Sequence, residues 1–118
     1  MPSSLPQAVQ SCHDLLLWMI PQLDKFPRMR RFTLGERLEV GLLGVLERLV
    51  GAAYSRQKEE PLRQGNLRLE VVRHLWRLAH ELKVIPTRQY EHGAKLCDDL
   101  GRQIGGWLRS RDRISPPS

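Results

Sequence analysis

The feature that most constrains this chain is a helical spacing of apolar residues that recurs along almost its whole length. In the stretch 25–53, KFPRMRRFTLGERLEVGLLGVLERLVGAA, apolar residues follow one another at intervals of three or four. At about 100° per residue, these intervals place the side chains on one face of a helix. The β-branched residues are scattered and never alternate with polar residues over a run, so no strand is predicted. We therefore expect a fold built from amphipathic helices.

Four segments of this kind, joined by short breaks, cover nearly all of the 118 residues. Segments of about 20 to 25 residues with short connections are typical of an up-down-up-down bundle. The sequence predicts an all-α four-helix bundle that forms one domain over residues 1–110. Residues 111–118 are basic and then Ser/Pro-rich, and we expect them to be a disordered tail. The expected helices run from about Leu5 to Lys25, Thr33 to Arg56, Pro61 to Lys83 and Arg88 to Ser110.

Local signals place the expected helix starts. Ser4 with Gln7, and Thr33 with Glu36, have the spacing of a capping box, in which two side chains satisfy free N–H groups at a helix N-terminus. Thr87 has the residue type of an N-cap. These signals predict helix starts near residues 5, 33 and 88.

Composition excludes a membrane-spanning segment, because no apolar run approaches the roughly 20 residues that a bilayer requires. The short run Leu15–Ile20 follows no charged segment, so no signal peptide is predicted. Cys12 and Cys97 occupy apolar helical positions, which favours reduced core cysteines in a cytoplasmic protein; a disulfide is the alternative.

Two features indicate more close-packing surface than one subunit requires. The apolar residues of the third segment cover an arc of roughly 200°, so the helix is buried on several sides or contacts another subunit. Gly41, Gly44 and Gly51 interrupt a strong helix pattern, at up to about 1 kcal/mol each. They allow tight helix packing within a subunit or close helix contact between subunits. We predict a closed homo-oligomer.

The net charge of +6 and the pI of about 10 favour a polyanionic partner, most simply nucleic acid. The alternative is a basic protein without such a partner. Three groups of basic residues are candidate contacts: a cluster at a turn, a pair on the third segment, and a row at intervals of seven on the fourth. They are Arg28, Arg30 and Arg31; Arg73 and Arg77; and Arg88, Lys95, Arg102 and Arg109.

The row at intervals of seven lies close to one line on its helix, since seven residues make nearly two turns. It has two interpretations. Glu91 precedes Lys95 by four residues, and Asp98 precedes Arg102 by four, which is the favoured orientation for helix-surface ion pairs. The row is therefore either a salt-bridged solvent face or a strip that binds a polyanion.

No pattern of catalytic residues is present. His74 and His80 are six residues apart, whereas a helical zinc pair requires a separation of four. No nucleophile elbow, P-loop or dinucleotide fingerprint occurs. We expect a protein that is not an enzyme and that carries no metal and no cofactor.

The order of several segments resembles one known family. LLLWMI, KFPRMRRFTLGERL, LLGVLERLVGAAY, LRLEVVRHLWRLAHELKVI and YEHGAKLCDDLGRQIGGWLRS follow one another as in the accessory variability determinant proteins of diversity-generating retroelements. That family belongs to a broader group of bacterial four-helix bundle proteins, some encoded by intervening sequences within ribosomal RNA genes. The most specific marks are Lys25-Phe26-Pro27-Arg28, Leu34-Gly35 and Gly105-Gly106-Trp107.

The resemblance implies a homopentamer of four-helix subunits with a positive surface. It implies binding to the retroelement's reverse transcriptase and to nucleic acid, in support of error-prone copying of template RNA into complementary DNA. Polymerisation would belong to the reverse transcriptase. Two other functions stay open: an interaction bundle of the ribosomal intervening-sequence type, and a generic basic module that binds RNA or DNA.

Overall fold

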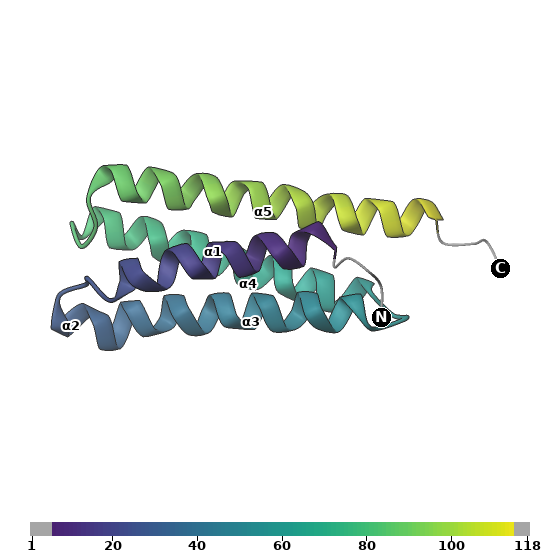
Figure 1. Ribbon diagram of the computed structural model, residues 1–118, viewed down its shortest axis with the longest axis horizontal. Helices are drawn as coiled ribbons and strands as arrows, with labels where there is room; N and C mark the ends of the chain where they lie inside the picture. The colour runs from purple at the N-terminus through teal and green to yellow at the C-terminus, as the bar shows by residue number, and fades with distance from the viewer. Residues whose placement is uncertain (1–5, 115–118) are drawn as a thin grey trace.

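Four long helices form an elongated bundle of 53 × 23 × 21 Å, and each helix runs antiparallel to the two on which it packs (Figure 1). The computed structural model describes the backbone of residues 6–114 and the side chains of residues 6–110. Helices α1 and α4 lie at opposite corners, and each packs on both α3 and α5. The prediction of an all-α, up-down-up-down bundle is confirmed, and no strand occurs within residues 6–114. The long helices are α1 (Gln7–Leu23), α3 (Glu36–Ala53), α4 (Glu59–Glu81) and α5 (Thr87–Ile114).

The second helical stretch begins earlier than the sequence predicted. A short helix α2 (Arg28–Arg30) continues into a π-helical turn η1 (Arg31–Gly35) and then into α3. Pro27 is extended at ψ 146°, and its carbonyl accepts from the backbone N–H of Arg30 at 2.8 Å and of Arg31 at 2.9 Å. Proline favours such a start because its fixed φ suits the entry to a helix. The predicted helix start at Thr33 is therefore wrong.

Thr33 lies inside the helix and does not cap it. Its hydroxyl donates to the carbonyl of Met29 at 3.1 Å, the backward hydrogen bond that threonine makes within a helix. No side-chain capping hydrogen bond occurs at the start of α2, η1 or α3. The capping box of Thr33 and Glu36 is wrong, because the helical stretch begins at Arg28, more than one turn before the position at which the box would act.

The other helix ends differ from prediction by a few residues. Helix α1 begins at Gln7, directly after Pro6, and Ser4 of the predicted capping box lies outside the described residues. Thr87 is the first residue of α5, and its hydroxyl oxygen lies 3.1 Å from Nε2 of His80. Helix α5 continues to Ile114, past the predicted end at Ser110. The first part of the predicted tail is thus helical, and 115–118 lie outside the described residues.

The core contains a tryptophan that bridges two helices. Trp76 of α4 is buried, and its indole N–H donates to the carbonyl of Tyr90 on α5 at 2.9 Å. The ring lies against Gly93, where a Cβ atom would come within 2.6 Å of the indole nitrogen. Trp18 of α1 meets Trp76 edge-on at 6.0 Å between ring centroids. These contacts fix α1, α4 and α5 together near one end of the bundle.

The glycines of α3 allow close packing against α4 within the same subunit. A Cβ at Gly41 would lie 2.8 Å from a methyl carbon of Val72, and one at Gly44 would lie 3.2 Å from Cδ of Arg68. Gly51 differs, because a Cβ there would meet nothing within 4 Å. Of the two interpretations of these glycines, packing within the subunit therefore accounts for Gly41 and Gly44.

Both cysteines belong to the core. Cys12 and Cys97 are buried and free. Burial raises the pKa of each thiol to about 12, and the nearby Cys97 sulfur adds to the rise at Cys12. The thiols are thus protonated at neutral pH and act as small apolar side chains.

Candidate functional site

The basic row predicted on the fourth segment is exposed along α5. All four of its side chains, Arg88, Lys95, Arg102 and Arg109, are exposed to solvent. The row spans 21 residues of helix, or about 32 Å at 1.5 Å per residue. Among the described side chains, neither Arg88 nor Lys95 forms an ion pair. We call these four residues the α5 strip.

The ion pairs around the strip differ from those that the spacing favoured. Arg102 pairs with Asp99, one turn back on α5. Asp98 instead pairs with Arg73 of α4, across the α4–α5 interface. The predicted pair of Asp98 with Arg102 is therefore wrong, because Asp98 points toward α4 rather than along the helix surface. Arg102 of the strip is therefore paired, whereas Arg88 and Lys95 form no ion pair with a described side chain.

The two arginines predicted on the third segment are neutralised by carboxylates. Arg73 is half-buried and bonds both Asp98 and, at 2.9 Å, Glu70. Nε of Arg77 donates to Glu81 at 3.0 Å, and this hydrogen bond raises the pKa of Arg77 further above its ordinary value. A polyanion would have to displace these carboxylates. Arg73 thus contributes to joining α4 with α5, and Arg77 to a helix-surface pair.

The third predicted group lies at a helix N-terminus. Arg28 and Arg30 are exposed, and within residues 6–110 neither forms an ion pair. Arg31 lies 3.4 Å from Asp24 and 5.8 Å from the centroid of the Phe32 ring. Cations at a helix N-terminus oppose the helix dipole and reduce helix stability. Arg28 and Arg30 therefore gain no stabilisation from the helix dipole at this position.

The topology brings some of these groups together and separates others. The α1–α2 turn and the α4–α5 turn lie at the same end of the bundle (Figure 1). Arg28, Arg30 and Arg88 thus share that end. Arg109 lies on the last turns of α5, at the opposite end. The predicted residues form one electropositive end that continues along α5, rather than a single compact site.

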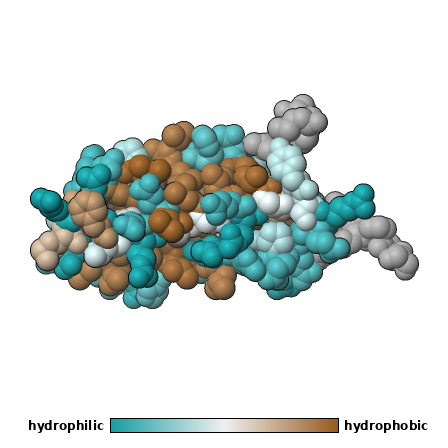
Figure 2. All heavy atoms as spheres, turned by 90° about the horizontal axis from the view of Figure 1, so that it is seen from below, coloured by the Kyte–Doolittle hydropathy of each residue, from teal (hydrophilic) through white to brown (hydrophobic). Residues whose placement is uncertain are grey.

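Apolar side chains cover a second surface, on the outer side of α3 and α4. Figure 2 shows them gathered over the middle of the face that α3 forms. On each helix, their spacing places them in one stripe, so the two stripes flank the α3–α4 contact. The wide arc of the third segment is therefore only partly buried. The exposed members are Val40, Leu43, Val50 and Tyr54 on α3, and Leu67, Val71, Leu78 and Leu82 on α4. We call these eight residues the α3–α4 face.

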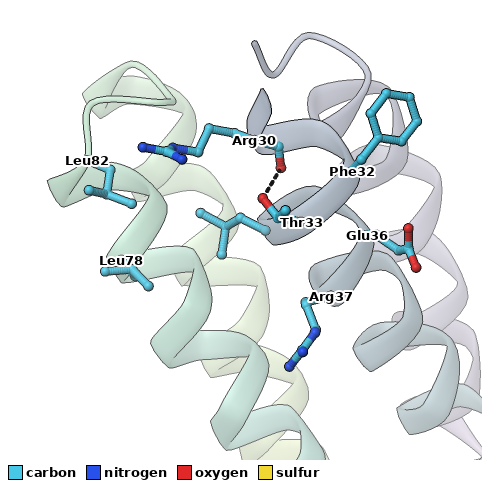
Figure 3. Close-up of a pocket in the computed structure, with 8 residues that line it drawn as sticks. Arg30, Phe32, Thr33, Glu36, Arg37, Leu78 and Leu82 are labelled. Atoms are coloured by element: carbon cyan, nitrogen blue, oxygen red, sulfur yellow. Dashed lines mark hydrogen bonds between the residues drawn. The ribbon is translucent and has the colours of Figure 1, made fainter. Parts of the chain in front are cut away.

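Sequence reasoning missed a groove at one end of this face. Between η1, the start of α3 and the end of α4 there is an open groove of about 590 Å³ (Figure 3). Its walls include Leu34, Leu78 and Leu82, with Arg30 and Arg37 beside them. Periodicity could not show it, because the π-helical turn changes the direction of the side chains from η1 onward.

The described residues contain neither a metal site nor a membrane-spanning helix. Nowhere in residues 6–110 do three or more His, Cys, Asp or Glu side chains lie close enough to hold a metal ion. In the same part of the chain, no helix combines the length and the apolar character needed to cross a membrane.

Fold and surface define a small basic four-helix bundle protein with a cationic strip and an uncovered apolar face. A family model described as bAvd-like matches residues 8–111, and the chain therefore belongs to the bAvd-like family. This match confirms the resemblance to accessory variability determinant proteins, and makes the chain an accessory protein of that type. Comparison with curated proteins and with solved structures gave no match.

Proposed function

We propose that this protein assists a diversity-generating retroelement by binding RNA or DNA and the reverse transcriptase as a closed homo-oligomer in the cytoplasm. The family membership supports the accessory role. In this proposal the protein is not an enzyme, and it holds the template near the polymerase that copies it. The resemblance implies five subunits.

The observation that carries the nucleic-acid part of the proposal is the α5 strip. Arg88 and Lys95 are exposed, and no described carboxylate pairs with them. Their contact with phosphate would release counterions without breaking an existing ion pair. In a closed oligomer each strip is repeated, so contacts that are individually weak add up. No aromatic residue is interleaved with the strip, so we expect little base stacking and little sequence preference.

The α3–α4 face supports assembly. Six of its eight side chains lie outside the groove lined by Leu78 and Leu82, and exposed apolar patches of this kind mark interaction sites. They are Val40, Leu43, Val50, Tyr54, Leu67 and Val71. Packing of this face on a different surface of a neighbouring copy would remove these side chains from water and could repeat around a ring. Closed cyclic symmetry is the general form of such assemblies.

The decisive experiment is a salt series on nucleic-acid binding, with unrelated single-stranded RNA and DNA sequences. Affinity for single strands should fall by roughly three-hundredfold between 50 and 200 mM salt if about six phosphates are neutralised. Lys95→Glu should weaken binding to all sequences alike. Arg102→Glu should weaken it less, because Arg102 already pairs with Asp99. Arg56→Glu, in the α3–α4 connection, makes the same charge change away from the strip and is the matched control.

Binding that is insensitive to salt, or equal loss in Lys95→Glu and Arg56→Glu, would remove the strip from the interface. A pull-down with the cognate reverse transcriptase tests the other partner. If neither nucleic acid nor the polymerase binds, the result would favour the alternative function, which is that of an interaction bundle of the ribosomal intervening-sequence type.

A further inference from the structure

The groove between η1 and α4 combines an apolar floor with cations at both ends. Leu78 and Leu82, on successive turns of α4, form one wall and are 40% and 47% exposed. Leu34 lies opposite them, on η1. In Figure 3 the side chain of Arg30 extends toward α4 beside Leu82, and Arg37 lies further along the groove. The opening is about 590 Å³, which is large enough for several side chains of a partner.

The two arginines of the groove lack a carboxylate partner in the part of the chain that the structure describes. Among the described residues, neither Arg30 nor Arg37 forms an ion pair. Glu36 also borders the groove, but its carboxylate points away from the two arginines (Figure 3). Arg30 precedes the π-helical turn and Arg37 follows it, and both border the groove. A ligand that satisfies both must carry two separate negative groups.

We propose that this groove binds an amphipathic helix of a partner protein, with leucine-like side chains on the apolar floor and two carboxylates on the arginines. A helix lying in an apolar groove is a common mode of peptide recognition. On such a helix, carboxylates seven residues apart are about 10 Å apart and lie on the same side. Apolar residues midway between them face the same way. The expected pattern is therefore Glu-x-x-Leu-Leu-x-x-Glu.

Charge favours an acidic helix over two other possible ligands of the groove, which are a second copy of this chain and a phosphate backbone. A second copy of this chain has a net charge of +6, and several of its surface carboxylates, such as Glu70, Glu81 and Asp98, are already paired. It would bring more positive charge to Arg30 and Arg37. A phosphate backbone would satisfy the arginines but would leave Leu78 and Leu82 against polar groups. An acidic, apolar helix matches both parts of the groove, and the inference goes beyond the nucleic-acid strip on α5.

The test uses the full chain and a fluorescein-labelled synthetic helix of about 16 residues, long enough to form in part when free, that carries the Glu-x-x-Leu-Leu-x-x-Glu pattern. We expect saturable binding by fluorescence anisotropy. Replacing both peptide glutamates by glutamine should weaken it by roughly tenfold or more, because two charge-assisted hydrogen bonds are lost. Arg30→Gln/Arg37→Gln should weaken it similarly, and Leu78→Ser/Leu82→Ser should abolish it. Arg56→Gln is the matched control, and circular dichroism verifies that each variant is folded.

Three outcomes would overturn the proposal. Equal affinity for the glutamate and glutamine peptides would show that the arginines are not used. A change of oligomeric mass in Arg30→Gln/Arg37→Gln would make the groove a contact between subunits. Displacement of the peptide from the wild-type protein by a single-stranded oligonucleotide would make the groove part of the nucleic-acid surface. Each result is separate from the effect of Lys95→Glu on salt-dependent binding, so the two proposals fail independently.

Discussion

Gly93 is the glycine at which an added Cβ atom would come closest to a neighbouring atom. A Cβ there would lie 2.6 Å from Nε1 and 2.7 Å from Cε2 of the Trp76 indole. The buried ring cannot move aside without losing its hydrogen bond to the Tyr90 carbonyl. We predict that Gly93→Ala lowers the free energy of unfolding by about 1–3 kcal/mol, through overpacking. Urea unfolding followed by circular dichroism measures the change.

Gly51→Ala is the matched control, because it adds the same methyl group to a helix where nothing lies within 4 Å. Alanine is the better helix former there, so the free energy of unfolding should rise by up to about 1 kcal/mol. Equal effects of the two substitutions would contradict the close contact between Gly93 and Trp76.

The buried thiols make stability depend on alkaline pH. The folded protein raises the pKa of Cys12 and Cys97 from 9.0 to about 12. Below pH 9 both folded and unfolded chains keep these protons, and the full stability is present. Above it only the unfolded chain loses them, so stability falls with pH by up to about 1.4 kcal/mol per pH unit for each thiol. We predict that urea unfolding between pH 9 and 11 shows a steeper loss in wild type than in Cys12→Ala/Cys97→Ala. Parallel losses would contradict the prediction.

At the scale of the helix, Lys58 closes the C-terminus of α3. Its ammonium group donates to the carbonyls of Ala52 at 2.8 Å and Ser55 at 2.7 Å. A cation at this position also interacts favourably with the helix dipole. We predict that Lys58→Met, which keeps the length of the chain, lowers the free energy of unfolding by about 1–2 kcal/mol. Lys95→Met, which removes an exposed charge from α5, should change it by less than about 0.5 kcal/mol. Equal thermal shifts in the two variants would show that the cap adds no stability.

The helices and the core could be predicted from sequence because both depend on periodicity. Leu38, Leu42 and Leu49 are spaced for one face of α3, and the structure buries all three completely. The start of that helical stretch could not be predicted in the same way. Thr33 and Glu36 have the spacing of a capping box, but Pro27 starts a helix several residues earlier. A capping motif involves only a few neighbouring residues. The helix instead begins where more of its backbone N–H and C=O groups are hydrogen-bonded.

The candidate surfaces were less accessible to prediction, since they depend on contacts between helices. Spacing along α5 favoured the pair Asp98–Arg102, yet Asp98 bonds Arg73 of the neighbouring helix. The groove at Arg30 and Arg37 requires both the π-helical turn and the end of α4. A sequence shows the residues of each helix, and only the packed bundle shows which of them face one another.

At the scale of the whole molecule, the α3–α4 face predicts how copies of the chain associate. Val71 is 53% exposed near the middle of this face, so a charge there costs the isolated subunit little. In an oligomer that covers the face, the same charge would be buried without a partner, at a cost of several kcal/mol at each contact. We predict that Val71→Glu dissociates the oligomer toward the 13.7 kDa monomer while retaining helix content.

Light scattering coupled to size exclusion measures the mass at micromolar concentration, and circular dichroism measures the helix content. Leu17→Glu is the matched control: Leu17 is 64% exposed on α1, outside the α3–α4 face. Its substitution introduces the same charge and should leave the mass unchanged. A monomeric wild type would exclude the assembly at this concentration. An intact Val71→Glu oligomer would show that the subunits associate through a surface other than the α3–α4 face.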